Sequence, residues 1–469
     1  MQRCQVIAVF GVVMLVVAGG CGGSSNSSTG GLPPHPSPTP TSRPTASPTP
    51  QASPTATPTA TPTPVATPTA KPTSTPSATP GYALLYSFQS GTDGANPASA
   101  GLAADGGTLF GTTRNGGGVG CGGDGCGTVY SISTSGAERV LHRFLGDPDG
   151  AEPDATLTDA GGTLYGTTSA GGVTNGYGTV FSITTVGQES VLHSFASGTD
   201  GADPIGAGLL YDGGTLYGVT SAGGSNSNGT VFSLTTAGAE AVLYAFGNGN
   251  DGATPVAGLA GSGGTYLGTT QYGGANRCGL TGCGAVYAVT PLGTENVLYS
   301  FRGGSDGRNP DSPLLSLNGT YYGTTPSGGG AANCTGGCGT VFSISSSGAE
   351  RVLYAFKGGT ADGAAPHGGL VALDGVLYGT TGSGGRYGYG TIFSITTSGT
   401  ETVLYDFAGG TDGAEPLAGL LGVDGTLYGT TSQGGGTACG GNGCGTVFAL
   451  SPASQARFPA ARPRAGFRR

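Results

Sequence analysis

Three short phrases recur seven times each in a fixed order along this chain, and no other feature restricts the fold as strongly. They are variants of "LYSF", "GTLYGTT" and "GTVFSI", and each reads as a β-strand because apolar and aromatic residues are bounded by glycine. A further apolar phrase, such as "AGLL" at 418–421, precedes each "GTLYGTT". The chain is therefore expected to repeat a unit of four strands.

The spacing of the repeats predicts the architecture. The last residue of each "LYSF" phrase recurs at intervals of 51 to 56 residues, at Phe88, Phe144, Phe195, Phe246, Phe301, Phe356 and Phe407. Four antiparallel strands in about 50 residues, repeated seven times, predict an all-β fold, a seven-bladed β-propeller over 81–452. A β-solenoid is the alternative, although its coils usually hold only about 20 to 30 residues.

The two ends of the array complement each other. It opens with a lone fourth-strand phrase, "YALLYSF" at 82–88, and closes with the third-strand phrase "GTVFAL" at 445–450. We expect the first strand to complete the last blade, because this leaves no unpaired sheet edge at the seam. In the seventh copy of the fourth strand, Tyr82 stands where the other copies have a glutamate. Those glutamates are Glu138, Glu189, Glu240, Glu295, Glu350 and Glu401.

The combination of "GTLYGTT", "GTVFSI", "VLYSF" and "GTDGA.P" resembles a known family. It is similar to the GloVer tandem repeat of "choice-of-anchor" bacterial surface proteins, and the similarity extends over 82–450. The resemblance implies repeats joined to varied surface anchors, and it implies no activity.

Residues 1–20 read as a lipoprotein-type signal peptide. Arg3 precedes an apolar run, 6–18, which is shorter than the roughly 20 residues that span a bilayer. The following "VAGGCGG" resembles the lipobox of bacterial lipoproteins, although Ala18 stands where Leu is usual, and this resemblance implies a lipid on Cys21. The lipid would anchor the chain in the bacterial cell envelope, at the outer membrane, the cell surface or the periplasm. Plain secretion is the alternative.

Two segments lack the composition of a folded domain. Pro, Thr and Ser dominate 21–80, where the frequent prolines remove amide donors and favour an extended, disordered stalk. Arginines give 453–469 a basic character typical of a solvated tail.

Eight of the ten cysteines form four local pairs in the loops between the second and third strands. These four loops hold 13 residues each, whereas the three cysteine-free loops hold 9, 8 and 8. In an exported protein the pattern predicts disulfides that close the longer loops. A four-thiolate zinc site between neighbouring blades is the alternative. The pairs are Cys121 and Cys126, Cys278 and Cys283, Cys334 and Cys338, and Cys439 and Cys444.

An aspartate recurs in the "DGAxP" loop between blades. These aspartates are candidates for a ligand-binding or cation-binding ring around the mouth of the central channel: Asp93, Asp149, Asp200, Asp251, Asp306, Asp362 and Asp412. The alternative is that each one caps its own turn. No cofactor is expected, unless calcium binds here with the help of Glu152, Asp203 and Glu415.

Charge and the other titratable residues favour binding over catalysis. The region 82–452 holds nine Lys and Arg residues against 26 acids, a net charge of −17, which disfavours nucleic acid as a partner. His142 and His193 occupy a tyrosine position, where packing explains them, and His367 has no such explanation. We therefore expect a non-catalytic module for an extracytoplasmic glycan or protein, with a secreted polysaccharide hydrolase or lyase that uses acidic residues on the propeller loop face as the alternative.

Overall fold

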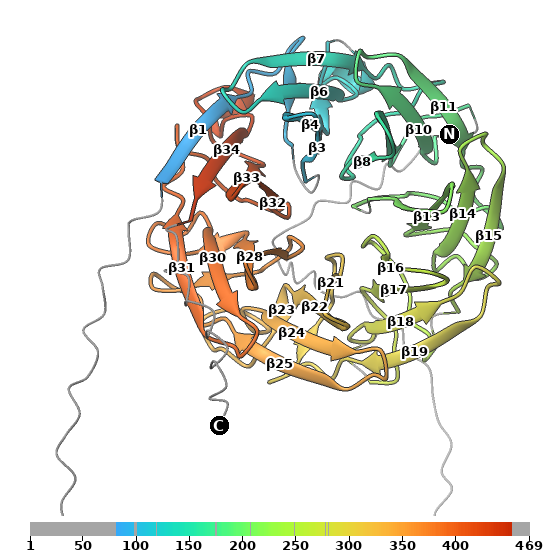
Figure 1. Ribbon diagram of the computed structural model, residues 1–469, viewed down its shortest axis with the longest axis vertical. Coiled ribbons are helices and arrows are strands. Elements are labelled where there is room, and N and C mark those ends of the chain that lie inside the picture. Colours follow the sequence, from blue (N-terminus) through green and yellow to red (C-terminus); the bar gives the residue numbers. More distant parts are fainter. Residues whose placement is uncertain are drawn as a thin grey trace, which may run out of the picture. The chain divides into compact units, whose positions relative to one another are not determined.

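The computed structural model describes residues 81–97, 101–118, 120–173, 176–206, 208–247, 249–276, 278–279 and 281–452. The expected signal peptide (1–20), stalk (21–80) and tail (453–469) lie outside the described residues, as does Cys21. The described residues form seven four-stranded antiparallel sheets that are arranged as a ring (Figure 1). The fold is a seven-bladed β-propeller, which confirms the prediction from the repeats.

Each blade runs from an innermost strand near the propeller axis to an outermost strand at the edge (Figure 1). In blades 1 to 7 the innermost strands are β3 (Ala103–Asp105), β8 (Thr158–Asp159), β12 (Leu210–Asp212), β16 (Ala260–Ser262), β21 (Leu315–Leu317), β27 (Val371–Leu373) and β32 (Leu421–Val423). The second strands are β4 (Thr108–Thr113), β9 (Thr163–Thr168), β13 (Thr215–Thr220), β17 (Thr265–Thr270), β22 (Thr320–Thr325), β28 (Val376–Thr381) and β33 (Thr426–Thr431).

The outer half of each blade is formed by the other two phrases. The third strands are β6 (Thr128–Ser133), β10 (Thr179–Thr184), β14 (Thr230–Thr235), β18 (Ala285–Val289), β24 (Thr340–Ser345), β30 (Thr391–Thr396) and β34 (Thr446–Ser451). The outermost strands of blades 1 to 6 are β7 (Glu138–Arg143), β11 (Glu189–Ser194), β15 (Glu240–Ala245), β19 (Glu295–Ser300), β25 (Glu350–Ala355) and β31 (Glu401–Asp406).

The N-terminal strand β1 (Gly81–Ser87) is the outermost strand of blade 7 and closes the ring. It pairs antiparallel with β34, with Tyr82 opposite Leu450. The strand order β1-β34-β33-β32 therefore joins the two ends of the array in one sheet, as the sequence predicts.

The repeated phrases meet between neighbouring blades. The closing Phe of each outermost strand packs edge-on against the aromatic ring of the next blade's third strand, as Phe195 does against Phe232 with centroids 5.3 Å apart. Opposite that ring, the middle glycine of "GTLYGTT" leaves the space it needs, since a Cβ on Gly218 would lie 2.5 Å from Phe232 Cζ. Seven clusters of buried apolar side chains, one at each blade interface, result from this packing.

Two sets of loops share one face of the propeller, called here the loop face. The loop after each outermost strand pairs with the loop between the second and third strands of the following blade. The paired segments are β2 (Gly94–Ala95) with β5 (Asn115–Gly116), β20 (Gly307–Arg308) with β23 (Ser327–Gly328), and β26 (Gly363–Ala364) with β29 (Ser383–Gly384). In the other blades the two loops are joined by isolated β-bridges, such as the one between Ala202 and Ala222. The 3₁₀ turns η1 (Cys121–Gly123) and η2 (Cys439–Gly441) also lie in these loops.

Candidate functional site

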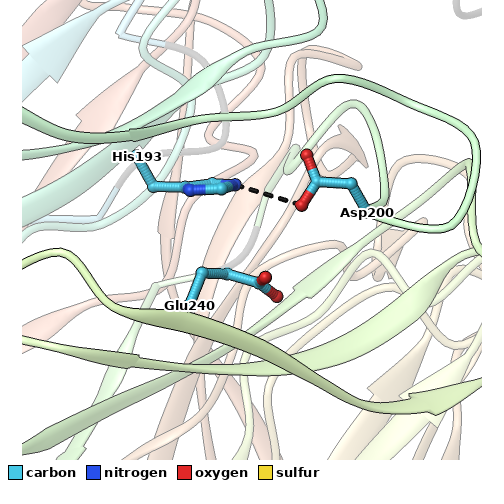
Figure 2. Close-up of side chains that lie close together, drawn as sticks. All are labelled: His193, Asp200 and Glu240. Carbon is cyan, nitrogen blue, oxygen red and sulfur yellow. Dashed lines mark hydrogen bonds and ion pairs between the residues drawn. The ribbon is translucent and has the colours of Figure 1, made fainter.

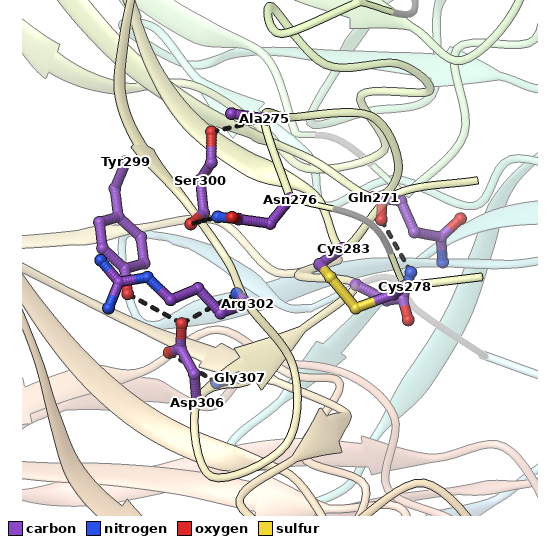
Figure 3. Close-up of a disulfide and its surroundings, with 11 residues drawn as sticks. Gln271, Ala275, Asn276, Cys278, Cys283, Tyr299, Ser300, Arg302, Asp306 and Gly307 are labelled. Carbon is purple, nitrogen blue, oxygen red and sulfur yellow. Dashed lines mark hydrogen bonds between the residues drawn. A yellow bond between two sulfur atoms is a disulfide. The ribbon is translucent and has the colours of Figure 1, made fainter. Parts of the chain in front are cut away.

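The seven repeated aspartates cap the turns that follow the outermost strands. Figure 3 shows Asp306, whose carboxylate accepts hydrogen bonds from Tyr299 Oη at 2.8 Å and from the amides of Arg302 at 2.9 Å and Gly307 at 2.8 Å. Each of the other six aspartates makes the equivalent hydrogen bonds, one with the Tyr or His at the same position of the outermost strand and one with a backbone amide of the turn. These contacts place the carboxylates at the outer edge of the loop face and not around the channel mouth.

A glutamate from the next blade packs beside six of these aspartates. Burial and, to a smaller extent, the negative charge of Asp251 on the preceding loop raise the pKa of Glu295 to about 7. The pKa values of Glu138, Glu240, Glu350 and Glu401 are raised to about 7 for the same two reasons, with burial the larger. Each of these interfaces thus holds a pair of neighbouring carboxyl groups.

The two histidines at the tyrosine position hydrogen-bond the same aspartates. His142 Nε2 lies 3.1 Å from Asp149, and His193 Nε2 lies 3.2 Å from Asp200 (Figure 2). Both rings also pack edge-on against a buried phenylalanine, Phe144 or Phe195, as the expectation of a packing role required. At His193 a further carboxylate, Glu240, completes a group of three ligand atoms within 4.8 Å of one another.

The four cysteine pairs are disulfides in the structure, as Figure 3 shows for Cys278 and Cys283. The second cysteine of each pair is buried. The carbonyl oxygen of this cysteine accepts a hydrogen bond from a backbone amide of the next inter-blade loop. For example, Glu152 N donates to Cys126 O at 2.9 Å. In the cysteine-free loops Tyr177, Asn228 and Tyr389 make this contact instead. Because the sulfurs are bonded in pairs, the four-thiolate zinc alternative is excluded.

The residues on either side of the loop proline differ from blade to blade. They lie on the loop face, in the stretch that runs inward from each outermost strand to the next blade's innermost strand. Of the charged residues at these positions, five are grouped here with Arg114, which contacts two of them, and called the inner cluster: Arg114, Glu152, Asp154, Asp311, His367 and Glu415. Since other blades carry uncharged residues at the same positions, the propeller fold does not require these charges, and they are candidates for specific recognition.

The inner cluster contains two groups of charges. Arg114 bridges blades 1 and 2 through Glu152 Oε2 at 2.6 Å and Asp154 Oδ2 at 3.2 Å. On the other side of the ring, His367 Nδ1 lies 2.7 Å from Asp311 Oδ2. Burial lowers the pKa of His367, but the charges of Asp311 and Glu415 outweigh it and the pKa lies above its usual value. In both places a basic side chain, Arg114 or His367, contacts a carboxylate of the inner cluster.

A comparison with protein families identifies the repeats as members of a known family. A model described as the Gloeobacter/Verrucomicrobia repeat matches residues 73–281 and 276–448. The chain belongs to this family. Its GloVer-type tandem repeat, which the sequence phrases indicated, is thus the unit from which the propeller is built.

Comparisons with curated proteins and solved structures do not indicate an activity for this member of the Gloeobacter/Verrucomicrobia repeat family. No curated protein matches the chain. A putative 6-phosphogluconolactonase from Bacteroides uniformis has 16% identity and a TM-score of 0.46, over 71% of this chain and 91% of its own. A putative oxidoreductase (glucose dehydrogenase) from Thermus thermophilus has 13% identity and a TM-score of 0.41, over 79% and 99%. Identities and scores this low carry no conclusion about function.

In this Gloeobacter/Verrucomicrobia repeat chain, one cysteine-free loop exposes aromatic rings on the loop face. Tyr387 is 51% exposed and Tyr389 is 47% exposed, and the guanidinium of Arg386 lies 5.5 Å from the Tyr387 centroid. The loop begins at Gly382, where a Cβ would lie 3.3 Å from His367. Its end meets Glu415, whose amide donates to Tyr389 O at 3.0 Å. The loop backbone thus contacts the inner cluster, whereas the ring of Tyr389 packs toward Gly409, in the loop after the outermost strand β31.

Sequence reasoning found part of the inner cluster. It singled out His367, Glu152 and Glu415, but it missed Arg114 and the aspartates after the loop prolines, Asp154 and Asp311. A signal was present, because the residue after each loop proline breaks the repeat. Among the described residues, no helix has the length and apolar content that a membrane span needs.

Proposed function

We propose that this protein is a cell-envelope lipoprotein whose propeller binds an extracytoplasmic glycan or protein on its loop face without chemical conversion. The observation that carries the proposal is the pair of half-exposed rings on the loop face, Tyr387 and Tyr389, with the guanidinium of Arg386 beside them. Half-exposed rings beside charged hydrogen-bonding groups suit the apolar faces and hydroxyl groups of sugars, so we favour a glycan. The negative charge of the repeats disfavours nucleic acid.

Binding is tested with the full chain carrying Cys21→Ser, which removes the proposed lipid attachment. A glycan array is probed with this protein and with a Tyr387→Ala, Tyr389→Ala variant. We expect retention of at least one glycan and a loss of about tenfold or more in affinity in the variant, equivalent to about 1.4 kcal/mol. Tyr211, 41% exposed on the innermost strand β12, gives the matched control Tyr211→Ala. Equal loss in both variants would contradict the assignment.

The anchor is tested separately. We expect labelled fatty acid to be incorporated into the full chain and not into Cys21→Ser, with the variant released from the membrane fraction. Labelling of both proteins would contradict lipidation at Cys21, without affecting the binding proposal.

A second function, polysaccharide cleavage, is favoured by one observation. Asp311 and His367 form an acid–base contact of 2.7 Å on the loop face, and such pairs transfer protons in catalysis. Incubation of any retained polysaccharide with the protein distinguishes the two functions. Shortened products that disappear with His367→Asn would support cleavage, whereas retention of full-length polysaccharide supports binding alone.

A further inference from the structure

We propose that His193, Asp200 and Glu240 form a binding site for one first-row transition metal ion, best suited to zinc, at the outer edge between blades 2 and 3. The three residues come from the outermost strands of blades 2 and 3 and from the loop that follows the first of these strands. His193 lies on β11, Asp200 on the loop after it, and Glu240 at the start of β15 (Figure 2). A bound ion would therefore join two neighbouring blades, and this site is separate from the inner cluster.

The spacing of the ligand atoms fits a small ion. His193 Nε2 and Asp200 Oδ1 are 3.2 Å apart, and all three ligand atoms lie within 4.8 Å. Bonds of about 2.0 to 2.2 Å in a tetrahedral zinc site place the ligand atoms roughly 3.3 Å apart, so a modest rotation of Glu240 completes three of four positions. An imidazole nitrogen among the ligands disfavours calcium and magnesium, which prefer oxygen.

A second observation points to a cation at this position. Glu240 Oε1 is shielded from solvent and has no hydrogen-bond partner in the structure. A buried acceptor without a donor is unfavourable, and a cation between Asp200 and the ionised form of Glu240 would satisfy it. The side chains of His193 and Asp200 are 20% and 21% exposed, so an ion can reach them.

The other blade interfaces show why the imidazole matters. Glu295 also has an unpartnered, shielded oxygen, but there the third group is Tyr244, whose hydroxyl donates to Asp251 at 2.9 Å. A neutral phenol that donates its proton is a poor metal ligand, whereas a neutral imidazole offers a lone pair. The interface of His142, Asp149 and Glu189 has the same residue types. It does not bring three ligand atoms within 4.8 Å.

These interfaces provide the control variants. His193→Tyr introduces the residue that five other blades carry at this position, so the fold is expected to be kept, and His142→Tyr makes the same change at the neighbouring interface. The metal-stripped full chain carrying Cys21→Ser is titrated with Zn²⁺ by calorimetry, and with Co²⁺ by visible absorption, which reports tetrahedral coordination. Melting in chelator checks that all variants are folded.

We expect one Zn²⁺ per chain in the Cys21→Ser protein and in His142→Tyr, and an affinity at least about 100-fold weaker in His193→Tyr and in Glu240→Gln. Zn²⁺ should also raise the melting temperature of His142→Tyr but not of His193→Tyr, since the ion bridges two blades. Equal binding by the Cys21→Ser protein and His193→Tyr would overturn the proposal, as would equal loss in His142→Tyr or no binding by any of the proteins.

Discussion

Tyr82 lies flat against Tyr405, with ring centroids 4.1 Å apart and ring planes 6° apart. The Tyr82 hydroxyl also donates to the carbonyl oxygen of Asp412 at 2.8 Å. Tyr82 stands on β1, at the place where the six other outermost strands carry a glutamate. The interface between blades 6 and 7 therefore has an aromatic stack where six others have a second carboxyl group, and this stack helps to hold the N-terminal strand in the ring.

Tyr82→Ala is expected to destabilise the propeller by about 2 kcal/mol, because it removes the stack and leaves a cavity at a partly buried position. Tyr82→Phe keeps the stack and loses one hydrogen bond, so about 1 kcal/mol is expected. Denaturant unfolding measures both. An unchanged midpoint in Tyr82→Ala would show that β1 contributes little to closure.

Gly218→Ala is expected to destabilise the protein by about 1 to 3 kcal/mol, because the new Cβ collides with the buried ring of Phe232. Gly422→Ala is the control, since its Cβ would meet only side-chain ends, Leu373 Cδ1 at 3.1 Å and Val371 Cγ2 at 3.7 Å. Thermal melting compares the two. Equal melting temperatures would mean that the glycine of "GTLYGTT" is not required for packing.

The inter-blade glutamates make stability depend on pH. The pKa of Glu295 is about 7 in the folded protein, above its usual value of 4.5, so the folded state binds this proton more tightly than the unfolded chain does. This contribution is fully present below pH 4.5 and is lost as the pH rises through 7. We therefore expect stability to fall between pH 5 and pH 8, more steeply than a single group would cause, since five glutamates share the shift.

Glu295→Gln tests this directly. The amide needs no proton, so the variant is expected to be more stable than the natural chain at pH 8 and similar to it at pH 4. Asp424→Asn, in an exposed turn, makes the same change in charge and serves as the control. If Glu295→Gln and Asp424→Asn had the same pH profile, the carboxyl pair would not be its source.

Asp311→Asn is expected to lower the pKa of His367. Removing the carboxylate leaves burial, which lowers this pKa, opposed mainly by Glu415. Titration of labelled histidine by NMR measures the change, and His142 in the same spectra is the internal reference. A pKa of His367 that stays above 6.5 and unchanged would rule out the Asp311 charge as its cause.

The disulfides predict a defined thiol count. The denatured, unreduced Cys21→Ser protein, once its signal peptide is removed, should show no reactive thiol, and eight after reduction. Replacing both Cys334 and Cys338 with Ala should cost at most about 2 kcal/mol, because the closed loop is short. Eight thiols before reduction would contradict the disulfides.

Some contacts could be predicted from the sequence because they repeat. The phrases around Phe195, Phe232 and Gly218 recur in every blade, so seven copies of one packing solution stand out above chance. Tyr82 broke the glutamate pattern and thereby marked the seam. Arg114 and Asp311 could not be found in this way, because a residue that differs between repeats marks a departure from the pattern but does not show which residues it contacts.

The sequence by itself determined the number of blades, the closure by the first strand and the loops that carry cysteines, because these follow from local periodicity and composition. Only the tertiary structure decided that the repeated aspartates lie at the outer edge and that Asp311 meets His367 from a different blade. It also brought Glu240 to the His193–Asp200 pair. The contacts of Asp311 with His367 and of Glu240 with the His193–Asp200 pair join residues about 40 to 56 positions apart. Their distances depend on how neighbouring sheets twist and pack, which no short stretch of sequence encodes.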